Sequence, residues 1–451
     1  MPVENSPDQE PKRQFIREKV VRPPMTRRQV VWRICVYALI ALIGGAAAGV
    51  SFAVARPLAE KYLVPEETTE SIPITIPTDE ELLPSDSSQI ETPVNENDQQ
   101  GTSPSESESE TQETEPLEDI LQSAIEKYEY TVDDLSSMYA SLKSVVTAAD
   151  NGIVVVHSVK QELDWFDNPV EVTGLYAGIV IASTSQELLI LTPESAVENA
   201  DSIMVGFNDN TEADGTIKQV DRISGMAVVS VDVLTLGEGT RKNVTALELG
   251  NSYGVRQGDL VVAVGAPSGM VHSSTYGFIS HVLRNVQVAD GITRLLFADI
   301  KGNAKAGTFL LNTSGQVVGW VTDEYKNEQN TNLTTVMAIS DYKTSLERMS
   351  NGVPIPYLGI KGQEVSATMT SSGLPMGLYV ADSILDGPAY NAGIQNGDVI
   401  VRMGSKPIIT IMDYENEIAS LNLNDEITIT VQRKGIDEYK ELEYQVTVGA
   451  R

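Results

Sequence analysis

Short apolar runs, separated by Gly, Asn and Asp, recur through the middle of this 451-residue chain. Each run is about four to nine residues long, which is the length of a β-strand rather than of a helix. Many short strands at even spacing are typical of an all-β sandwich or a pair of barrels. The pattern predicts strands over residues 152–159, 174–182, 188–191, 203–207, 227–231, 259–264, 294–298, 307–311 and 316–322.

Apolar residues recur at helical spacing ahead of these strands, over residues 117–149. Leu135, Met138 and Tyr139 fit one face of a helix. Thr131 followed by Asp134 matches a capping box, which predicts that a helix starts there. Two roles fit this helical segment: it drives oligomerisation, or it packs against the domain that follows.

An uncharged run of 22 residues, 34–55, lies closer to the start of the chain. At about 1.5 Å per residue, a helix of this length spans the roughly 30 Å hydrocarbon core of a bilayer. Eight Lys and Arg residues precede it within residues 1–33. The positive-inside rule therefore predicts a cytoplasmic tail over residues 1–33 and an extracytoplasmic chain after the membrane helix. A cleaved signal peptide is the alternative, although its charged and apolar regions would both be unusually long.

The chain between the apolar run and the helical segment, residues 56–116, is rich in Ser, Thr, Pro and Glu. Such a composition cannot bury enough apolar area to offset the entropy lost on ordering, so we predict a disordered acidic stalk. The net charge of −31 argues against nucleic acid as a partner. The single cysteine, Cys35, excludes an intramolecular disulfide and a cysteine-based metal site.

Five segments of the middle region resemble, in order, parts of the trypsin-like domain of HtrA/Deg proteases. The first two resemble the segments around the catalytic His and Asp. The next two resemble the A-I-G-N-P-x-G turn and the T-x-G-x-V-S strand. The last, together with Ala298-Asp299 before it, resembles the strands around the nucleophile. These segments are Leu189–Asp201, Asp221–Val229, Val262–Gly269, Thr275–Ser280 and Gly307–Gly319. The resemblance implies a chymotrypsin/trypsin-like double β-barrel over residues 150–350.

The residues that carry catalysis in that family are replaced in this chain. A serine-protease triad needs a nucleophile, an imidazole base and a carboxylate that orients the base. The positions that match the family's His, Asp and Ser are Ser195, Gly225 and Ala306. A shift of the last alignment by two residues would give Ala304 instead of Ala306, but no serine occurs between Ser280 and Ser314.

Substitutes for the triad are scarce. The histidines of the chain are His157, His272 and His281, and each fits a packing or surface role. Thr308 carries a hydroxyl, but the pattern places no base beside it. We therefore predict that this domain does not hydrolyse peptides. The sequence contains no metal-spaced cluster of His, Asp or Glu and no phosphate-binding Gly loop, so we expect no metal and no cofactor.

Residues 354–450 resemble the PDZ domains of HtrA proteins. Gly387–Ile400 matches the family run S-P-A-x-x-A-G-I-x-x-G-D-x-I, and a helix is predicted over Asp413–Leu421. The residues that resemble the carboxylate-binding loop and its strand are Tyr357, Leu358, Gly359 and Ile360. In such a loop, backbone N–H groups receive the terminal carboxylate of a peptide, and the strand edge adds the peptide as a further strand. The simpler interpretation is that these glycines only form turns.

The sequence thus predicts a mainly β fold, a trypsin-like double barrel followed by a PDZ domain, with an N-terminal transmembrane helix. The favoured function is a membrane-anchored, extracytoplasmic pseudoprotease that binds peptides or C-terminal segments of partner proteins, as a chaperone, adaptor or sensor. One alternative is an active HtrA-like endopeptidase that uses displaced residues. The other is an oligomeric adaptor that assembles through residues 117–147.

Overall fold

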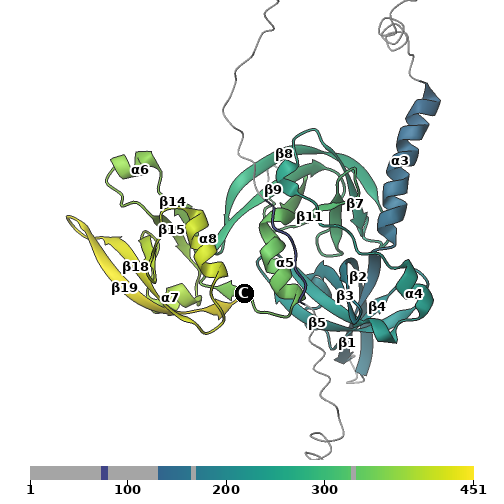
Figure 1. Ribbon diagram of the computed structural model, residues 1–451, viewed down its shortest axis with the longest axis horizontal. Coiled ribbons are helices and arrows are strands. Elements are labelled where there is room, and N and C mark those ends of the chain that lie inside the picture. Colours follow the sequence, from purple (N-terminus) through teal and green to yellow (C-terminus); the bar gives the residue numbers. More distant parts are fainter. Residues whose placement is uncertain (1–72, 80–130, 164–168, 327–331) are drawn as a thin grey trace, which may run out of the picture. The chain divides into compact units, whose positions relative to one another are not determined.

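The computed structural model describes residues 73–79, 131–163, 169–326 and 332–451 (Figure 1). The predicted cytoplasmic tail, the predicted membrane helix and residues 117–130 of the helical segment lie outside these residues, so they stay predictions. Within the described ranges, no helix combines the length and the apolar character that a membrane crossing requires.

A closed barrel of six antiparallel strands forms the first half of the middle region (Figure 1). Around the barrel the strand order is β1-β2-β3-β6-β5-β4, and β4 pairs with β1 to close it. The strands are β1 (Ile153–Leu163), β2 (Pro169–Ser183), β3 (Glu187–Pro193), β4 (Ser202–Gly206), β5 (Glu212–Asp221) and β6 (Met226–Asp232).

A second closed six-stranded barrel follows, in the order β10-β11-β12-β9-β8-β7, with β10 paired to β7. The predicted double barrel is therefore confirmed. The strands are β7 (Leu260–Gly265), β8 (Thr275–Val288), β9 (Gly291–Asp299), β10 (Thr308–Leu311), β11 (Val317–Val321) and β12 (Thr334–Ala338). The connections carry η1 (Glu194–Ala196), η2 (Val233–Thr235), α4 (Glu238–Asn243), η3 (Ser252–Gly254), η4 (Ile339–Tyr342) and α5 (Lys343–Ser350).

Three apolar cores hold the barrels together: one inside each barrel and one between them. Successive residues of a strand point to opposite faces. In β3, Leu188 and Ile190 therefore face the interior of the first barrel, whereas Leu189 and Leu191 face the layer between the barrels. Both faces of such strands are buried, which explains why they read as continuous apolar runs in the sequence.

Three barrel strands, β5, β8 and β12, were not predicted by the apolar pattern, although the start of β8 was identified by its resemblance to the T-x-G-x-V-S strand. Most side chains of β5 and β8 are exposed or only partly buried, so neither strand carries a continuous apolar run. In β12, the run is interrupted at its start by Thr334 and Thr335, which the fold nevertheless buries. The apolar pattern therefore identified buried apolar segments and not every strand.

The helix α3 (Val132–Asp150) precedes the first barrel (Figure 1). Its predicted capping box is confirmed: the Asp134 N–H donates to the Thr131 hydroxyl at 3.3 Å, and the Thr131 N–H donates to the Asp134 carboxylate at 2.7 Å. Leu135, Met138 and Tyr139 are exposed, and Ala149 is the buried residue of the helix. Among the described residues, α3 thus packs on its own chain at its C-terminal end.

The C-terminal region folds around a separate apolar core. An antiparallel sheet in the order β14-β15-β16-β18-β19 packs against α8, which corresponds to the predicted helix Asp413–Leu421. Its elements are β13 (Pro356–Tyr357), β14 (Ile360–Glu364), α6 (Ala367–Ser371), β15 (Leu378–Ser383), α7 (Pro388–Ala392), β16 (Val399–Met403), β17 (Lys406–Pro407), α8 (Ile411–Ala419), β18 (Glu426–Lys434), β19 (Tyr439–Thr447) and β20 (Gly449–Ala450). The strand β14 lies at the edge of this sheet, with β15 as its neighbour.

Candidate functional site

The three positions that match a catalytic triad meet where the two barrels face each other. Ser195 lies in η1, directly after β3, and Ala306 lies in the loop before β10. The Ser195 hydroxyl donates to the main-chain carbonyl of Lys305 at 2.8 Å. Gly225, in the turn between β5 and β6, accepts the N–H of Glu194 with its carbonyl at 2.9 Å. The fold therefore brings all three positions together.

The main chain around Ala306 satisfies its own hydrogen bonds. The Ala306 N–H donates to the side-chain oxygen of Asn303 at 3.0 Å. In a serine protease the N–H of the nucleophile is one of the oxyanion-hole donors, so this donor is already used within the loop. The Thr308 hydroxyl donates to the Asn303 carbonyl and accepts the Asn303 N–H, both at 3.0 Å, and is buried. The alternative nucleophile position, Ala304, packs against the core of the second barrel.

Gly225, at the position that resembles the family's Asp, carries no side chain. Gly225 has a φ of +68°, and a Cβ added there would meet no atom within 4 Å. The nearby Asp221 is fully buried, but its carboxylate accepts the Ile223 N–H at 3.1 Å and lies 3.5 Å from the guanidinium of Arg451. Asp221 therefore holds the turn and the last residue of the chain rather than an imidazole, a role that the sequence analysis did not identify.

The three histidines of the chain lie on separate elements of the barrels or their loops. His157 lies on β1, and the ring of His281 on β8 is 6.2 Å from that of Phe297. The Nδ1 atom of His272 is 2.8 Å from the carboxylate of Asp150. Among the described residues, no histidine hydrogen-bonds to a Ser or Thr hydroxyl. Nor does any group of three or more His, Cys, Asp or Glu side chains in that part of the chain lie close enough to hold a metal ion.

The predicted peptide-binding loop contains Tyr357 at the end of β13 and leads into β14. The N–H groups of Leu358, Gly359 and Ile360 all donate to one carboxylate, that of Asp290, at 2.8 to 3.0 Å. Asp290 lies in the tight turn between β8 and β9 of the second barrel. Burial, followed by the Asp290 charge, raises the pKa of the Tyr357 phenol. The sequence analysis missed Asp290, because Asp-Gly between two strands is typical of an ordinary hairpin turn.

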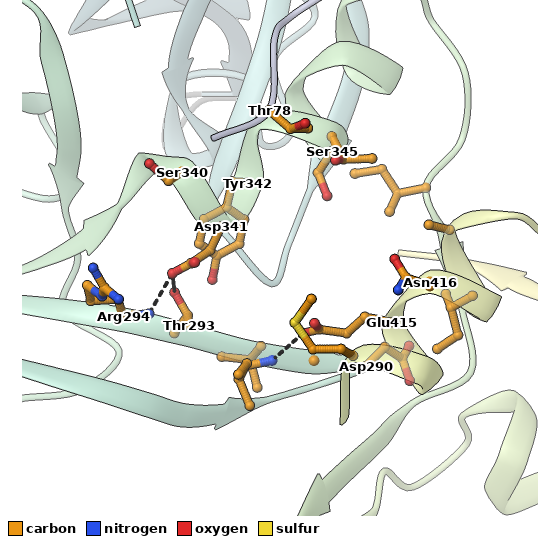
Figure 2. A pocket seen from close by; sticks show the side chains of 18 of the residues that line it. Thr78, Asp290, Thr293, Arg294, Ser340, Asp341, Tyr342, Ser345, Glu415 and Asn416 are labelled. Atoms are coloured by element: carbon orange, nitrogen blue, oxygen red, sulfur yellow. Dashed lines mark hydrogen bonds between the residues drawn. The ribbon is translucent and has the colours of Figure 1, made fainter. Parts of the chain in front are cut away.

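A pocket of about 290 Å³ opens beside this hairpin (Figure 2). Glu415 of α8 accepts the Ile292 N–H at 2.8 Å, and Asp341 of η4 accepts the Arg294 N–H at 2.6 Å. Burial is the main cause of a raised pKa at both carboxyls, and it lifts the pKa of Glu415 from 4.5 to about 7. The pocket therefore holds a carboxyl group that changes charge near neutral pH.

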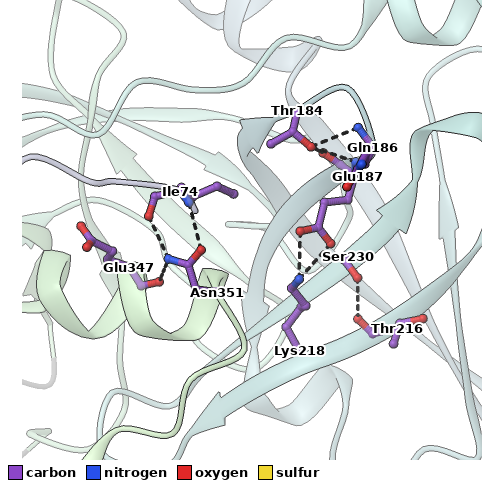
Figure 3. Close-up of polar contacts among 9 residues, drawn as sticks. All are labelled: Ile74, Thr184, Gln186, Glu187, Thr216, Lys218, Ser230, Glu347 and Asn351. Carbon is purple, nitrogen blue, oxygen red and sulfur yellow. Dashed lines mark hydrogen bonds and ion pairs between the residues drawn. The ribbon is translucent and has the colours of Figure 1, made fainter. Parts of the chain in front are cut away.

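Residues 73–79 lie against α5, next to the same pocket (Figure 3). The Ile74 N–H donates to the Asn351 side-chain oxygen at 2.9 Å, and the Asn351 amide donates back to the Ile74 carbonyl at 2.8 Å. Asp79 pairs with the buried ammonium of Lys343 at 2.9 Å. The sequence analysis placed these residues in a disordered stalk and did not anticipate this contact. In this stretch Ile74 and Ile76 alternate with exposed residues and pack against the core between the barrels.

Two family models match the folded part of the chain: a trypsin-like peptidase domain over residues 177–319 and a PDZ domain over residues 356–446. A probable periplasmic serine endoprotease DegP-like of Pseudomonas putida (strain W619) is 29% identical over 292 residues, which are 63% of this chain and 57% of the relative. The chain belongs to the HtrA family. The chain spans little more than half the length of this relative.

Other proteins resemble the HtrA chain more distantly. A putative serine protease HhoB of Synechocystis sp. is 26% identical over 279 residues, which are 58% of this chain and 64% of the relative. The solved structure of a variant of the HtrA-type protease AlgW with a decapeptide has a TM-score of 0.50 and 21% identity. The match covers 69% of this chain and 97% of that chain, and it shows the shared fold.

Replacing Glu415 with Gln should remove a pH dependence of stability. Between pH 4.5 and about 7 the folded chain holds a proton on Glu415 that the unfolded chain has lost. The wild type should therefore lose stability relative to Glu415→Gln as the pH rises through this window, and the difference should level off above it. Thermal unfolding of both chains at pH 5, 6, 7 and 8 measures this, with the neighbouring Asp341 and Arg451 common to both. A difference between the two unfolding midpoints that stays constant from pH 5 to 8 would contradict the prediction.

Asp79→Ala should release residues 73–79 from α5. The substitution removes the partner of an ammonium whose side chain is only 5% exposed. A hydrogen bond to a charged group contributes about 2 kcal/mol, so amide exchange at Ile74 and Ile76 should accelerate by about 30-fold. Hydrogen exchange detected by mass spectrometry measures this, and the exposed Asp214→Ala serves as the control. Equal exchange in the two variants would show that the ion pair does not hold the segment.

Proposed function

We propose that this HtrA-family chain binds peptides or C-terminal segments of partner proteins and does not cleave them. The proposal rests on the residues found at the triad positions: Ser195, Gly225 and Ala306. None of them carries an imidazole or a carboxylate. The one hydroxyl among them, that of Ser195, donates to the Lys305 carbonyl.

Peptide hydrolysis requires more than a cleft of suitable shape. A nucleophile must attack the carbonyl, a base must take its proton, and N–H donors must stabilise the oxyanion. In this chain position 306 offers no nucleophile, position 195 offers no base, and Asn303 engages one N–H donor. Loss of a whole triad lowers turnover by on the order of 10⁶. Peptide binding does not require these catalytic groups, so it is compatible with their loss.

The PDZ domain supplies the proposed site for peptide C-termini, at Tyr357, Leu358, Gly359 and Ile360. Three consecutive N–H groups of this loop converge on one carboxylate, which is the arrangement that would receive the terminal carboxylate of a peptide. The loop leads into the edge strand β14, to which an extended peptide can add as a further strand. Ile360 would help to line the pocket for the terminal side chain.

The proposed location of the barrels and the PDZ domain is outside the cytoplasm. The DegP-like relative is described as periplasmic, and the uncharged run 34–55 has the length of a transmembrane helix. A single anchor with residues 1–33 in the cytoplasm would hold the folded domains at the outer face of the membrane. Roles in chaperoning, partner recruitment or sensing all suit a peptide-binding protein at that place.

We predict that the purified chain does not cleave unfolded casein, and that Ala306→Ser alone does not restore cleavage because no imidazole stands at position 195. Release of fluorescent peptides from labelled casein measures turnover, and a fluorophosphonate probe reports an activated serine. An HtrA protease with an intact triad is the positive control. Casein cleavage by the wild type that a serine-protease inhibitor abolishes would establish the alternative, an active endopeptidase.

A second candidate role, assembly into an oligomer, is favoured by one observation. Leu135, Met138 and Tyr139 are large apolar side chains that α3 exposes. Light scattering should give a multiple of the 48.8 kDa chain mass for the wild type and a monomer for Leu135→Glu with Met138→Glu. Ser136→Glu with Ala140→Glu adds the same charge to α3 and should leave the oligomer intact. A monomeric wild type would remove this role.

A further inference from the structure

The carboxylate of Asp290 is held as a peptide terminus would be held. Its Oδ2 atom accepts the N–H groups of Leu358 at 2.8 Å and Gly359 at 3.0 Å, and its Oδ1 atom accepts those of Gly359 and Ile360 at 3.0 Å. The Tyr414 hydroxyl of α8 donates to Oδ1 at 2.9 Å. Asp290 is only 4% exposed, so the negative charge is balanced by these donors rather than by water.

The residues around Asp290 also make contacts that a peptide added beside β14 would make. The Asp290 N–H donates to the Ile360 carbonyl at 2.7 Å, which is the main-chain pairing expected of a strand added beside β14. Two residues further on, the Ile292 side chain packs against the PDZ core, and its N–H donates to Glu415 of α8 at 2.8 Å. Figure 2 shows Asp290 and Glu415 at the same end of the pocket. The turn of the β8–β9 hairpin therefore combines a carboxylate, a strand contact and an apolar side chain.

Two carboxylates cannot occupy one set of donors. The buried N–H groups of Leu358, Gly359 and Ile360 would each lose a hydrogen bond if Asp290 left and nothing replaced it, which is unfavourable. A free C-terminal carboxylate of a peptide satisfies the same donors. A peptide must therefore compete with Asp290, and its apparent affinity falls by the fraction of chains in which the loop is open.

We propose that Asp290 is the resident ligand of the PDZ carboxylate-binding loop, and that a peptide with a free C-terminal carboxylate binds by replacing it. This inference rests on the peptide binding proposed above. Replacement detaches the β8–β9 hairpin from the PDZ domain. The strands β8 and β9 belong to the second barrel, so peptide binding is coupled to whether this hairpin contacts the PDZ domain. The coupling acts equally in both directions.

The test compares the full chain with Asp290→Asn and with Asp386→Asn. Asp290 has a φ of +60° and Asp386 a φ of +61°, a conformation that Asn tolerates, so the two variants make the same change in the same backbone geometry. Asp386 is exposed on a turn of the PDZ domain and does not contact the loop donors. The probe is the fluorescein-labelled peptide Ala-Ala-Ala-Ala-Ile, used with a free carboxylate and as the amide.

Fluorescence anisotropy should give about tenfold tighter binding of the free-acid peptide to Asp290→Asn than to the wild type, because more chains have an open loop. Asp386→Asn should behave as the wild type, and the amide should bind none of the three. Without peptide, amide exchange at Leu358, Gly359 and Ile360 should be faster in Asp290→Asn than in the other two chains. The NH2 group of the Asn side chain is a donor and cannot accept the backbone N–H groups of the loop.

The outcomes separate this inference from the proposed function. Equal peptide affinity and equal amide exchange in the wild type and Asp290→Asn would overturn the inference and leave peptide binding in place. Absence of binding in every chain would contradict peptide binding and, with it, replacement of Asp290. In that case, faster exchange in Asp290→Asn would still support Asp290 as the occupant of the loop, and unchanged exchange would refute it.

Discussion

The apolar layer between the two barrels is the constraint on which the rest of the structure depends. Alternate residues of β3, β6, β7 and β10 face this layer, and their neighbours fill the barrel interiors. Burial of these side chains from water fixes where the strand ends lie. Ser195 follows β3, Gly225 precedes β6 and Ala306 lies just before β10, so these positions meet whatever side chains they carry.

How much of the fold the sequence predicted depended on burial. Strands with two buried faces were evident from continuous apolar runs. The apolar pattern did not predict β5 or β8, because much of their surface meets solvent, and the start of β8 was identified only through its family resemblance. The positions of Ser195, Gly225 and Ala306 were assigned to the triad by resemblance to the family, and in the structure these three residues lie close together. Asp290 was not found, because its partners are backbone N–H groups that leave no trace in the sequence. The contact of residues 73–79 with α5 was hidden by the polar composition around it.

Two buried carboxylates of this protein hold main-chain segments in place. Asp221 accepts a main-chain N–H of its own turn, and Asp290 accepts three from the PDZ loop. Both are buried, and each is balanced by nearby donors or by a guanidinium. Negative charge is therefore used to join segments that are distant in the sequence. In the proposed peptide-binding function, the Asp290 carboxylate competes with the C-terminal carboxylate of the bound peptide.

The contact between Asn303 and the Ala306 N–H bears on what peptide hydrolysis would require of this scaffold. Introducing His, Asp and Ser at the triad positions would still leave an amide of the oxyanion site turned toward a neighbouring side chain. The developing charge of a tetrahedral intermediate would then lack one of its supports. Peptide hydrolysis by this scaffold would consequently require changes in the loop as well as at the triad positions. No single substitution provides both.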